Sequence, residues 1–373
     1  MINALDFLTQ TIRMGASDLF IVAGRQLSCK KDGRIETIGE ERLMPADTAQ
    51  LIRDIYSLAD GRDLSRLQTR GDDDFSFAVS GLSRFRVSAY MQRGSMAAVI
   101  RIITFELPDP RALGIPEAVI SLGSLPRGLV LVTGPAGSGK STTLACIIDA
   151  INQTQEKHII TMEDPLEYLH RHKKSIVSQR EISSDTESYV TALRASLRQS
   201  PDVILLGEMR DFETISIAMT AAETGHLVLS TLHTPGAAST IDRIIDVFPP
   251  GQQRQIAVQL STTLQAVVSQ QLLQAADGSA RTAAFELMTM TPAIRNMIRE
   301  NKIPQIDGMI YSASSDTMFS MDTSLAALCR SGRITREEAL SHASNPEMLK
   351  KSCKTPMGNT YFISGLRQRS VQT

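Results

Sequence analysis

A glycine-rich loop between an apolar strand and a helical pattern restricts what this chain can fold into more than any other feature. Residues 134–141 read GPAGSGKS and fit the pattern G-x-x-x-x-G-K-[ST]. The apolar run at 129–132 is typical of a buried parallel strand. After the loop, four aliphatic residues fall on one helical face: Leu144, Ile147, Ile148 and Ile151. This order predicts an α/β site for a nucleoside triphosphate, because a chance glycine-rich turn would rarely have both flanks correct.

The residue types in the loop suit phosphate oxygens and a divalent cation. Glycines let successive backbone N–H groups turn toward the α- and β-phosphates, and the start of the following helix adds positive potential. Lys140 can reach the β- and γ-phosphates, and the Ser141 hydroxyl suits Mg²⁺. The expected nucleotide contacts are Gly134, Pro135, Ala136, Gly137, Ser138, Gly139, Lys140, Ser141 and Thr142.

Length and charge limit the classes of partner. At 373 residues the chain is longer than a protein with a single hydrophobic core usually is. At roughly 150 residues per domain, this length predicts two or three domains. With 39 basic and 40 acidic residues the formal net charge is −1, so no global field favours nucleic acid or an anionic bilayer. The basic run at 170–174 lacks interleaved aromatic residues and is interpreted as a solvated face.

Cysteine spacing and hydropathy indicate the compartment. No C-x-x-C pair occurs, which argues against a zinc ribbon and favours a reducing environment. The cysteines are Cys29, Cys146, Cys329 and Cys353. The amino-terminal segment lacks the apolar centre of a signal peptide, and no stretch approaches 18 uninterrupted apolar residues. We therefore expect a cytoplasmic protein without direct membrane insertion.

Composition and periodicity divide the chain into five parts. They are a small α+β unit at 1–105, a proline-rich linker at 106–126, alternating strands and helices of a parallel sheet at 127–290, a helical region at 291–350 and a loose tail at 351–373. In the first part, strands are expected at 18–22, 75–79, 84–90 and 97–103, and helices at 5–12, 48–56 and 64–69. A capping box at Thr335 and Glu338 predicts the start of a late helix.

Two acidic residues follow apolar strands of the predicted sheet, where α/β folds gather ligands. The strand at 158–162 ends at Glu163, and Pro165 stops it so that the acid projects from a turn. A carboxylate there could orient and partly deprotonate water, although a solvated acidic turn fits the same pattern. The strand at 203–206 is followed by Glu208, which is suited to Mg²⁺ near the phosphate loop, although many buried strands end in an acid.

Two histidines flank a third strand. His226 precedes it and His233 follows it. A neutral imidazole could sense the γ-phosphate or bridge to a neighbouring subunit, while histidines satisfied by structural hydrogen bonds fit the spacing too. A metal pair is disfavoured, because residues seven apart on a strand face opposite sides.

Together and in this order, these segments resemble the secretion ATPase superfamily (GspE/PilT/VirB11-like), which powers type II secretion and type IV pili. They resemble most closely its pilus retraction branch of PilT type. The resemblance covers nearly the whole chain, including GASDL at 15–19 and RFRV at 84–87. The segment at 163–165 corresponds to the family's Asp box, 207–211 to its Walker B segment and 220–234 to its His box.

The retraction branch is favoured by AIRNMIRE at 293–300, which differs from that branch's AIRNLIRE signature only at Met297. Extension and secretion ATPases usually carry a larger N-terminal region and a four-cysteine zinc insert, which this sequence lacks. The segment is interpreted as a coupling surface, although an ordinary amphipathic helix with Ile294 and Ile298 facing the core fits it as well. Three residues depart from the family's usual pattern: Phe20, Ala136 and Ser230.

The resemblance implies an N-terminal α+β (PAS-like) domain followed by a RecA-like P-loop ATPase core with a helical C-terminal region. It implies a cytoplasmic homo-hexameric ring at the inner face of the cell membrane, binding ATP and Mg²⁺ between the domains and against the adjacent subunit. The implied partners are an inner-membrane pilus platform protein (PilC-like) and a PilU-like or PilB-like paralogue. Nucleic acid is not among the expected partners.

The resemblance also assigns roles. Lys140 holds ATP, Ser141 and Glu208 serve Mg²⁺ directly or through water, and Glu163 orients the attacking water; which of Glu163 and Glu208 is the general base stays open. Arginines are expected at the triphosphate, although a surface ion pair suits each one equally. The arginine candidates are Arg86, Arg93, Arg101, Arg194 and Arg210. The expected catalytic set is Lys140, Glu163, Arg194, Glu208, Arg210, His226 and His233.

Three functions fit these features to different degrees. The leading one is an ATP-hydrolysing motor that retracts type IV pili for twitching motility. The second is an extension, secretion or DNA-uptake ATPase, or an accessory retraction ATPase of PilU type. The third is a ring adaptor that binds nucleotide without hydrolysis, against which intact Lys140, Glu163 and Glu208 argue.

Overall fold

The computed structural model describes residues 3–31, 33–103, 105, 107–278, 280–313 and 315–352. The chain divides into two compact units, one of Met1–Leu107 with Ile151–Gly207 and one of Pro108–Ala150 with Glu208–Thr373. The predicted boundaries between the five parts stay predictions, and residues 353–373 of the expected tail lie outside the described residues. None of the helices in the described ranges has the length and hydropathy needed to cross a bilayer.

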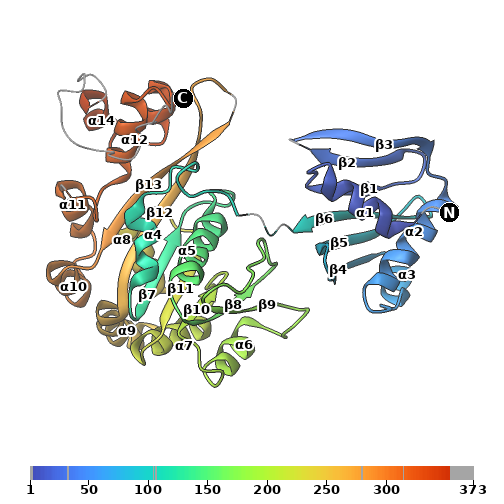
Figure 1. Ribbon diagram of the computed structural model, residues 1–373. Coiled ribbons are helices and arrows are strands. Elements are labelled where there is room, and N and C mark those ends of the chain that lie inside the picture. The colour runs from blue at the N-terminus through green and yellow to red at the C-terminus, as the bar shows by residue number, and fades with distance from the viewer. Residues whose placement is uncertain are drawn as a thin grey trace, which may run out of the picture. The chain divides into compact units, whose positions relative to one another are not determined.

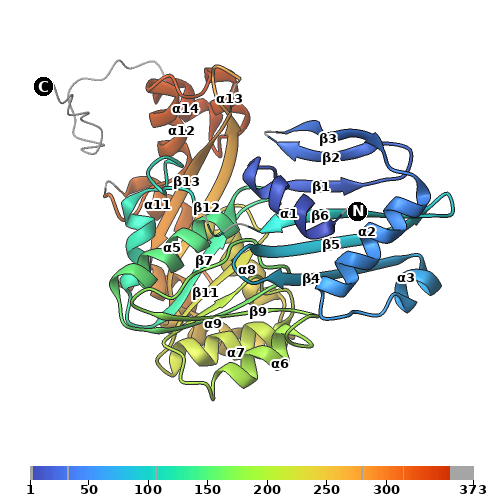
Figure 2. The same ribbon diagram turned by 45° about the vertical axis from the view of Figure 1, so that its right-hand side comes forward.

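The first unit contains an antiparallel sheet. In sheet order its strands are β3 (Arg34–Arg42), β2 (Gln26–Lys31), β1 (Asp18–Ile21), β6 (Ser95–Ile103), β5 (Ser83–Gln92) and β4 (Asp72–Val79). Its helices are α1 (Ala4–Arg13), α2 (Pro45–Leu58) and α3 (Ser65–Arg70). Figures 1 and 2 both show α1 and α2 lying across one face of this sheet. The strands β2 and β3 were not expected. Strand β3 is an exposed, charged strand with Ile38 as its buried residue, so it lacks the apolar pattern of a strand.

A buried carboxylate ties α2 and the segment after it to the sheet. Asp73 on β4 is 1% exposed and accepts a hydrogen bond from the Tyr56 hydroxyl at 2.9 Å. The Arg62 guanidinium binds the same carboxylate through two nitrogens, at 2.9 and 3.0 Å. Burial opposes the charge of Asp73, but the hydrogen bonds from Arg62 and Tyr56 outweigh it and hold the pKa of Asp73 below its usual value.

We expect Asp73→Ala to lower the free energy of unfolding by about 3 kcal/mol, because it leaves the buried Tyr56 hydroxyl and the Arg62 guanidinium without their acceptor. Urea unfolding followed by circular dichroism measures the change. The neighbouring Asp74 is exposed, so Asp74→Ala is the matched control and should stay within about 0.5 kcal/mol of the unsubstituted protein. Equal losses in the two variants would contradict a structural role for the buried carboxylate.

The second sheet is mostly parallel. In sheet order its strands are β13 (Arg281–Thr289), β12 (Leu264–Gln274), β7 (Gly128–Thr133), β11 (Leu227–Leu232), β10 (Val203–Leu206), β8 (His158–Glu163) and β9 (Ile176–Glu181). The pairs β12–β7, β7–β11, β10–β8 and β8–β9 are parallel, as expected. The expected crossover helix is absent between β12 and β13, which pair antiparallel. A short turn suffices there, and Gly278 in it has a φ of 71°.

Helices accompany this sheet and form the carboxyl-terminal region. They are α4 (Glu117–Ile120), the 3₁₀ helix η1 (Ser121–Ser124), α5 (Lys140–Thr154), α6 (Tyr189–Ser196), α7 (Phe212–Glu223), α8 (Ala237–Asp246), α9 (Pro250–Thr263), α10 (Pro292–Arg299), α11 (Gln305–Ser312), α12 (Met321–Arg330), α13 (Arg336–Ser341) and α14 (Pro346–Ser352). At α13 the Thr335 hydroxyl accepts from Glu338 N at 3.1 Å, which is the N-cap half of the predicted capping box. The Glu338 carboxylate instead accepts from Gln274 N at 2.8 Å.

The α10 helix is amphipathic and caps the end of α9. Ile294 and Ile298 are fully buried, as the apolar spacing predicts. Arg295 on the same helix donates through Nη1 to the carbonyl oxygens of Ser261 at 2.5 Å and Thr262 at 3.2 Å. Arginine at the end of a helix satisfies carbonyls that have no partner within the helix.

Candidate nucleotide site

The glycine-rich loop connects β7 to α5 and needs its glycines for packing as well as for conformation. Gly134 and Gly139 have φ values of 137° and 87°, which side chains rarely adopt. A Cβ atom on Gly134 would lie 2.2 Å from the backbone oxygen of Gln270, and one on Gly139 would lie 2.9 Å from Gln270 Nε2. Gln270 on β12 therefore fills the space beside the loop.

The interior of the loop carries the polar groups that a phosphate needs. Lys140 begins α5, is 7% exposed, and donates through Nζ to the carbonyl oxygens of Gly134 and Pro135, both at 2.9 Å. Ser138 Oγ is buried and has no hydrogen-bond partner among the described residues. A buried ammonium and an unsatisfied hydroxyl inside a glycine loop at a helix start fit a nucleotide phosphate.

Gln270 is a residue that sequence reasoning missed. Its side-chain oxygen accepts from the Thr143 hydroxyl of α5 at 2.7 Å, so β12 and the helix after the loop are joined through it. Gln270 is 3% exposed. The available signal was a polar run, Ser269 to Gln271, that separates the apolar residues at 266–268 and 272–273 of strand β12.

Glu208 lies in a charged cluster in the second unit. Its Oε2 atom is 2.8 Å from Arg210 Nε and 3.6 Å from His233 Nε2. His233 follows the carboxyl end of β11, which runs parallel to β7, so His233 and the phosphate loop leave the sheet at the same edge. The structure thus brings together three residues of the expected catalytic set, Glu208, Arg210 and His233.

Glu163 ends β8 in the first unit, where its surroundings favour a neutral carboxyl. Thr161 Oγ1 donates to Glu163 Oε1 at 2.8 Å. Burial, opposed by this hydrogen bond and helped by the negative charge of Glu167, raises the pKa of Glu163 to about 7. A carboxylate with a pKa near neutrality is suited to accept a proton from water. The turn after β10 lies beside it, since Gly207 N donates to Met162 O at 2.8 Å.

The other expected residues have separate surroundings. His226 lies at the amino end of β11, and its Nδ1 is 2.9 Å from the carbonyl oxygen of Ala221, so the structure places it at the opposite end of that strand from His233. Arg101 forms an ion pair with Asp18 at 3.0 Å within the first sheet. Arg194 lies on α6. Arg86 lies on β5, and Arg93 lies in the turn after that strand.

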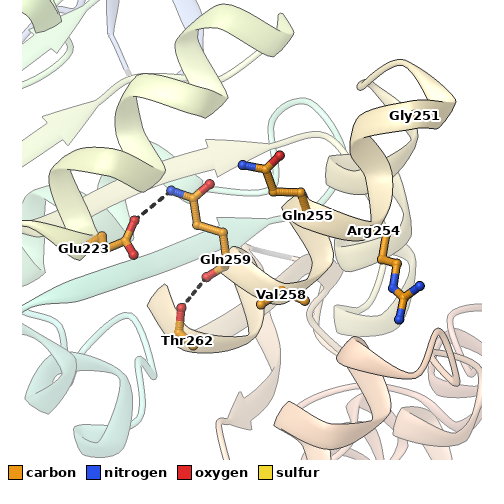
Figure 3. Close-up of a pocket in the computed structure, with 7 residues that line it drawn as sticks. All are labelled: Glu223, Gly251, Arg254, Gln255, Val258, Gln259 and Thr262. Carbon is orange, nitrogen blue, oxygen red and sulfur yellow. Dashed lines mark hydrogen bonds between the residues drawn. The ribbon is translucent and has the colours of Figure 1, made fainter.

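A shallow groove on the second unit lies away from these residues. Figure 3 shows its lining along α9 and the end of α7: Glu223, Gly251, Arg254, Gln255, Val258, Gln259 and Thr262. Glu223 ends α7 before β11, and Thr262 lies near the end of α9 before β12. The groove therefore lies toward the amino ends of strands whose carboxyl ends face the phosphate loop. It is no part of the nucleotide site.

The sequence matches the family described as "Type II/IV secretion system protein" over residues 2–339. This chain belongs to the type II/IV secretion system protein family. The type IV pilus retraction ATPase PilT of Pseudomonas aeruginosa is 45% identical over 92% of this chain and 98% of its own length. The type IV pilus ATPase PilU of the same organism is 38% identical over 92% and 89%.

Structural comparison agrees with the family. A crystal structure of the pilus retraction motor PilT with bound ADP has a TM-score of 0.85 and 45% identity, and covers 94% of this chain and 100% of that one. The predicted resemblance to secretion ATPases and the α/β class, with an N-terminal sheet domain before a parallel-sheet ATPase core, are confirmed. The general phosphate-loop pattern G-x-x-x-x-G-K-[ST] is complete here, from Gly134 to Ser141.

Proposed function

We propose that this protein is an ATP-hydrolysing motor that powers type IV pilus retraction. The observation that carries the proposal is the match to a retraction ATPase over nearly the full length of both chains, joined to a complete phosphate loop. The α10 segment supports the retraction branch through its AIRNMIRE sequence. The higher identity to PilT than to PilU favours the main motor over the accessory one.

The proposed site combines the loop with acids that follow neighbouring strands. Backbone N–H groups of the loop and Lys140 hold the phosphates, and the Ser138 hydroxyl gains a partner there. Ser141 and Glu208 hold Mg²⁺, which neutralises charge on the β- and γ-phosphates when bound. Glu163 accepts a proton from the attacking water, because its raised pKa matches the working pH. Arg210 and His233 fix the direction of the Glu208 carboxylate.

The proposed assembly is a homo-hexameric ring at the cytoplasmic face of the inner membrane. Head-to-tail contacts close into rings, in which one subunit's arginines can reach the next subunit's nucleotide. Arg86, Arg93, Arg194 and the strand-flanking His226 are the candidates for such contacts. Movement of the ring would act on a PilC-like platform protein, with a PilU-like or PilB-like paralogue as a further partner.

Deletion of the gene tests the direction of pilus movement. We expect cells that keep surface pili and lose surface motility, because pili would still assemble and would no longer be withdrawn. Complementation with the unsubstituted gene should restore motility. Loss of the pili themselves would point to an extension ATPase, and ATP hydrolysis that requires a second ATPase would point to the accessory, PilU-type role.

A further inference from the structure

Glu286 is a buried carboxylate that the proposed reaction does not use. It lies on β13 and is 8% exposed. Its two oxygens accept backbone N–H groups from different helices, Oε1 from Ala237 at 2.9 Å and Oε2 from Met321 at 3.3 Å. These residues begin α8 and α12, so a single side chain joins the starts of two helices. Helix starts favour a negative charge, and the two backbone hydrogen bonds offset part of the cost of burying the carboxylate, although burial still raises the pKa of Glu286.

The start of α8 is also where the loop that carries His233 ends. Thr234 Oγ1 lies 2.7 Å from Thr240 Oγ1, which folds the loop against the first turn of α8. Gly236 N donates to Ser269 Oγ at 3.0 Å. Ser269 on β12 is the direct cross-strand partner of Glu286 on β13. Two neighbouring side chains of one hairpin thus hold consecutive backbone N–H groups at the end of this loop.

The start of α12 belongs to the carboxyl-terminal helices. The backbone of Leu287, the residue after Glu286, exchanges two hydrogen bonds with Phe319, at 2.9 and 3.0 Å. Asp322 in the first turn of α12 accepts from the backbone of Ser344 and Asn345, at 2.7 and 2.8 Å. The α12 helix is therefore fixed to the segment before α14 by Asp322, and to α8 by Glu286.

We propose that Glu286 is a positioning residue that couples the carboxyl-terminal helices to the loop carrying His233, and through it to Glu208. His233 lies 3.6 Å from Glu208, so a shift of the loop changes the surroundings of that carboxylate. This role rests on the proposed function, in which Glu208 serves the metal ion of the nucleotide. Through this coupling, a displacement of α12 changes the surroundings of Glu208 by way of Glu286 and the His233 loop, and α12 need not contact the nucleotide.

Two buried carboxylates give a matched test. Glu286→Gln keeps the size of the side chain and offers one oxygen in place of two, so one helix start loses its acceptor. Asp322→Asn makes the same chemical change at a carboxylate that holds the carboxyl-terminal segment alone. We expect Glu286→Gln to lower kcat about tenfold or more, with the Kd for ATP within about twofold of the unsubstituted value. Asp322→Asn should lower the Tm and leave kcat within about twofold.

Hydrogen exchange reports the coupling directly. Glu286→Gln should speed amide exchange at both 234–240 and 320–325, whereas Asp322→Asn should speed it at 344–349 and not at 234–240, because Asp322 holds the backbone of Ser344 and Asn345. The coupling is wrong if kcat of Glu286→Gln is unchanged per folded molecule, or if both variants lose kcat equally. If Glu286→Gln does not fold, Ser269→Ala, a smaller change that frees Gly236 N, should reproduce the loss of kcat, and normal turnover in it would equally reject the proposal.

The same measurements separate this inference from the proposed function. Failure of the unsubstituted protein to bind or hydrolyse ATP would reject the motor and the inference together. Normal hydrolysis in the unsubstituted protein with an inert Glu286→Gln substitution would reject the inference and leave the motor standing.

Discussion

Replacing Lys140 by alanine should abolish ATP hydrolysis, with a fall in kcat/KM of about a thousandfold or more. The ammonium of Lys140 is the buried positive charge inside the loop, and both of its described carbonyl partners belong to the loop itself. Loss of this charge leaves the β- and γ-phosphates facing backbone donors alone. Phosphate release from purified protein with Mg²⁺ and ATP measures the effect, and calorimetry with ATP measures binding.

Lys174→Ala is the control for this substitution, because Lys174 is exposed on the basic run at 170–174. It should hydrolyse ATP at the unsubstituted rate. If Lys140→Ala kept full turnover, the loop would not be the site of hydrolysis, whatever the family resemblance implies. Removal of Mg²⁺ with a chelator should reduce turnover of the unsubstituted protein to a similar extent, because the metal ion shares the neutralisation of phosphate charge.

Glu163→Gln should lower kcat by about 10² to 10⁴ while the Kd for ATP stays within about twofold. Glutamine keeps the shape and the oxygen that accepts from Thr161, but it cannot accept a proton from water. Single-turnover hydrolysis separates this chemical step from product release. Glu208→Gln is the comparison that shows which carboxylate is the general base. If Glu208 binds the metal ion, its substitution should lower kcat and also raise the Mg²⁺ concentration needed for hydrolysis.

The pKa of Glu163 gives this prediction a pH dependence. A carboxyl whose pKa is raised to about 7 is mostly protonated at pH 6, so kcat should rise as the pH increases through about 7 and then level off. Glu167→Gln should move the midpoint to lower pH, because the negative charge of Glu167 contributes to raising the pKa. A midpoint near 4.5, or the same profile in Glu163→Gln, would show that another group is the base.

The parts of the fold that the sequence predicted best are those in which local pattern and burial agree. Strands β7 and β10 are buried along their whole length, so each reads as an unbroken apolar run. Strand β3 gave no such signal, because an exposed edge strand buries one side chain and carries charge elsewhere. The β12–β13 hairpin was missed because both strands are mostly buried. Neither therefore shows the alternation of apolar and polar residues by which a half-buried strand is identified in a sequence.

Within the site, sequence motifs identified the residues expected to act on the nucleotide. They did not identify the residues that hold those segments in place by hydrogen bonds. The loop, Glu163 and Glu208 stand out because each follows an apolar strand. Gln270 binds Thr143, just after the phosphate loop, from a position more than a hundred residues further along the chain. Glu286 binds the end of the His233 loop from a position about fifty residues further along. Such contacts depend on the order of strands in the sheet. The sequence analysis did not give that order, because it did not identify β13.

The position of Arg295 limits which residues of α10 a partner protein can contact. Its guanidinium is turned inward onto the carbonyl oxygens that end α9, although the segment at 293–300 is interpreted from its sequence as a coupling surface. Alanine at Arg295 would unravel the neighbouring helix end, and the resulting defect would mimic a lost contact. The exposed residues of α10, among them Asn296 and Arg299, are better placed than Arg295 to contact a partner protein.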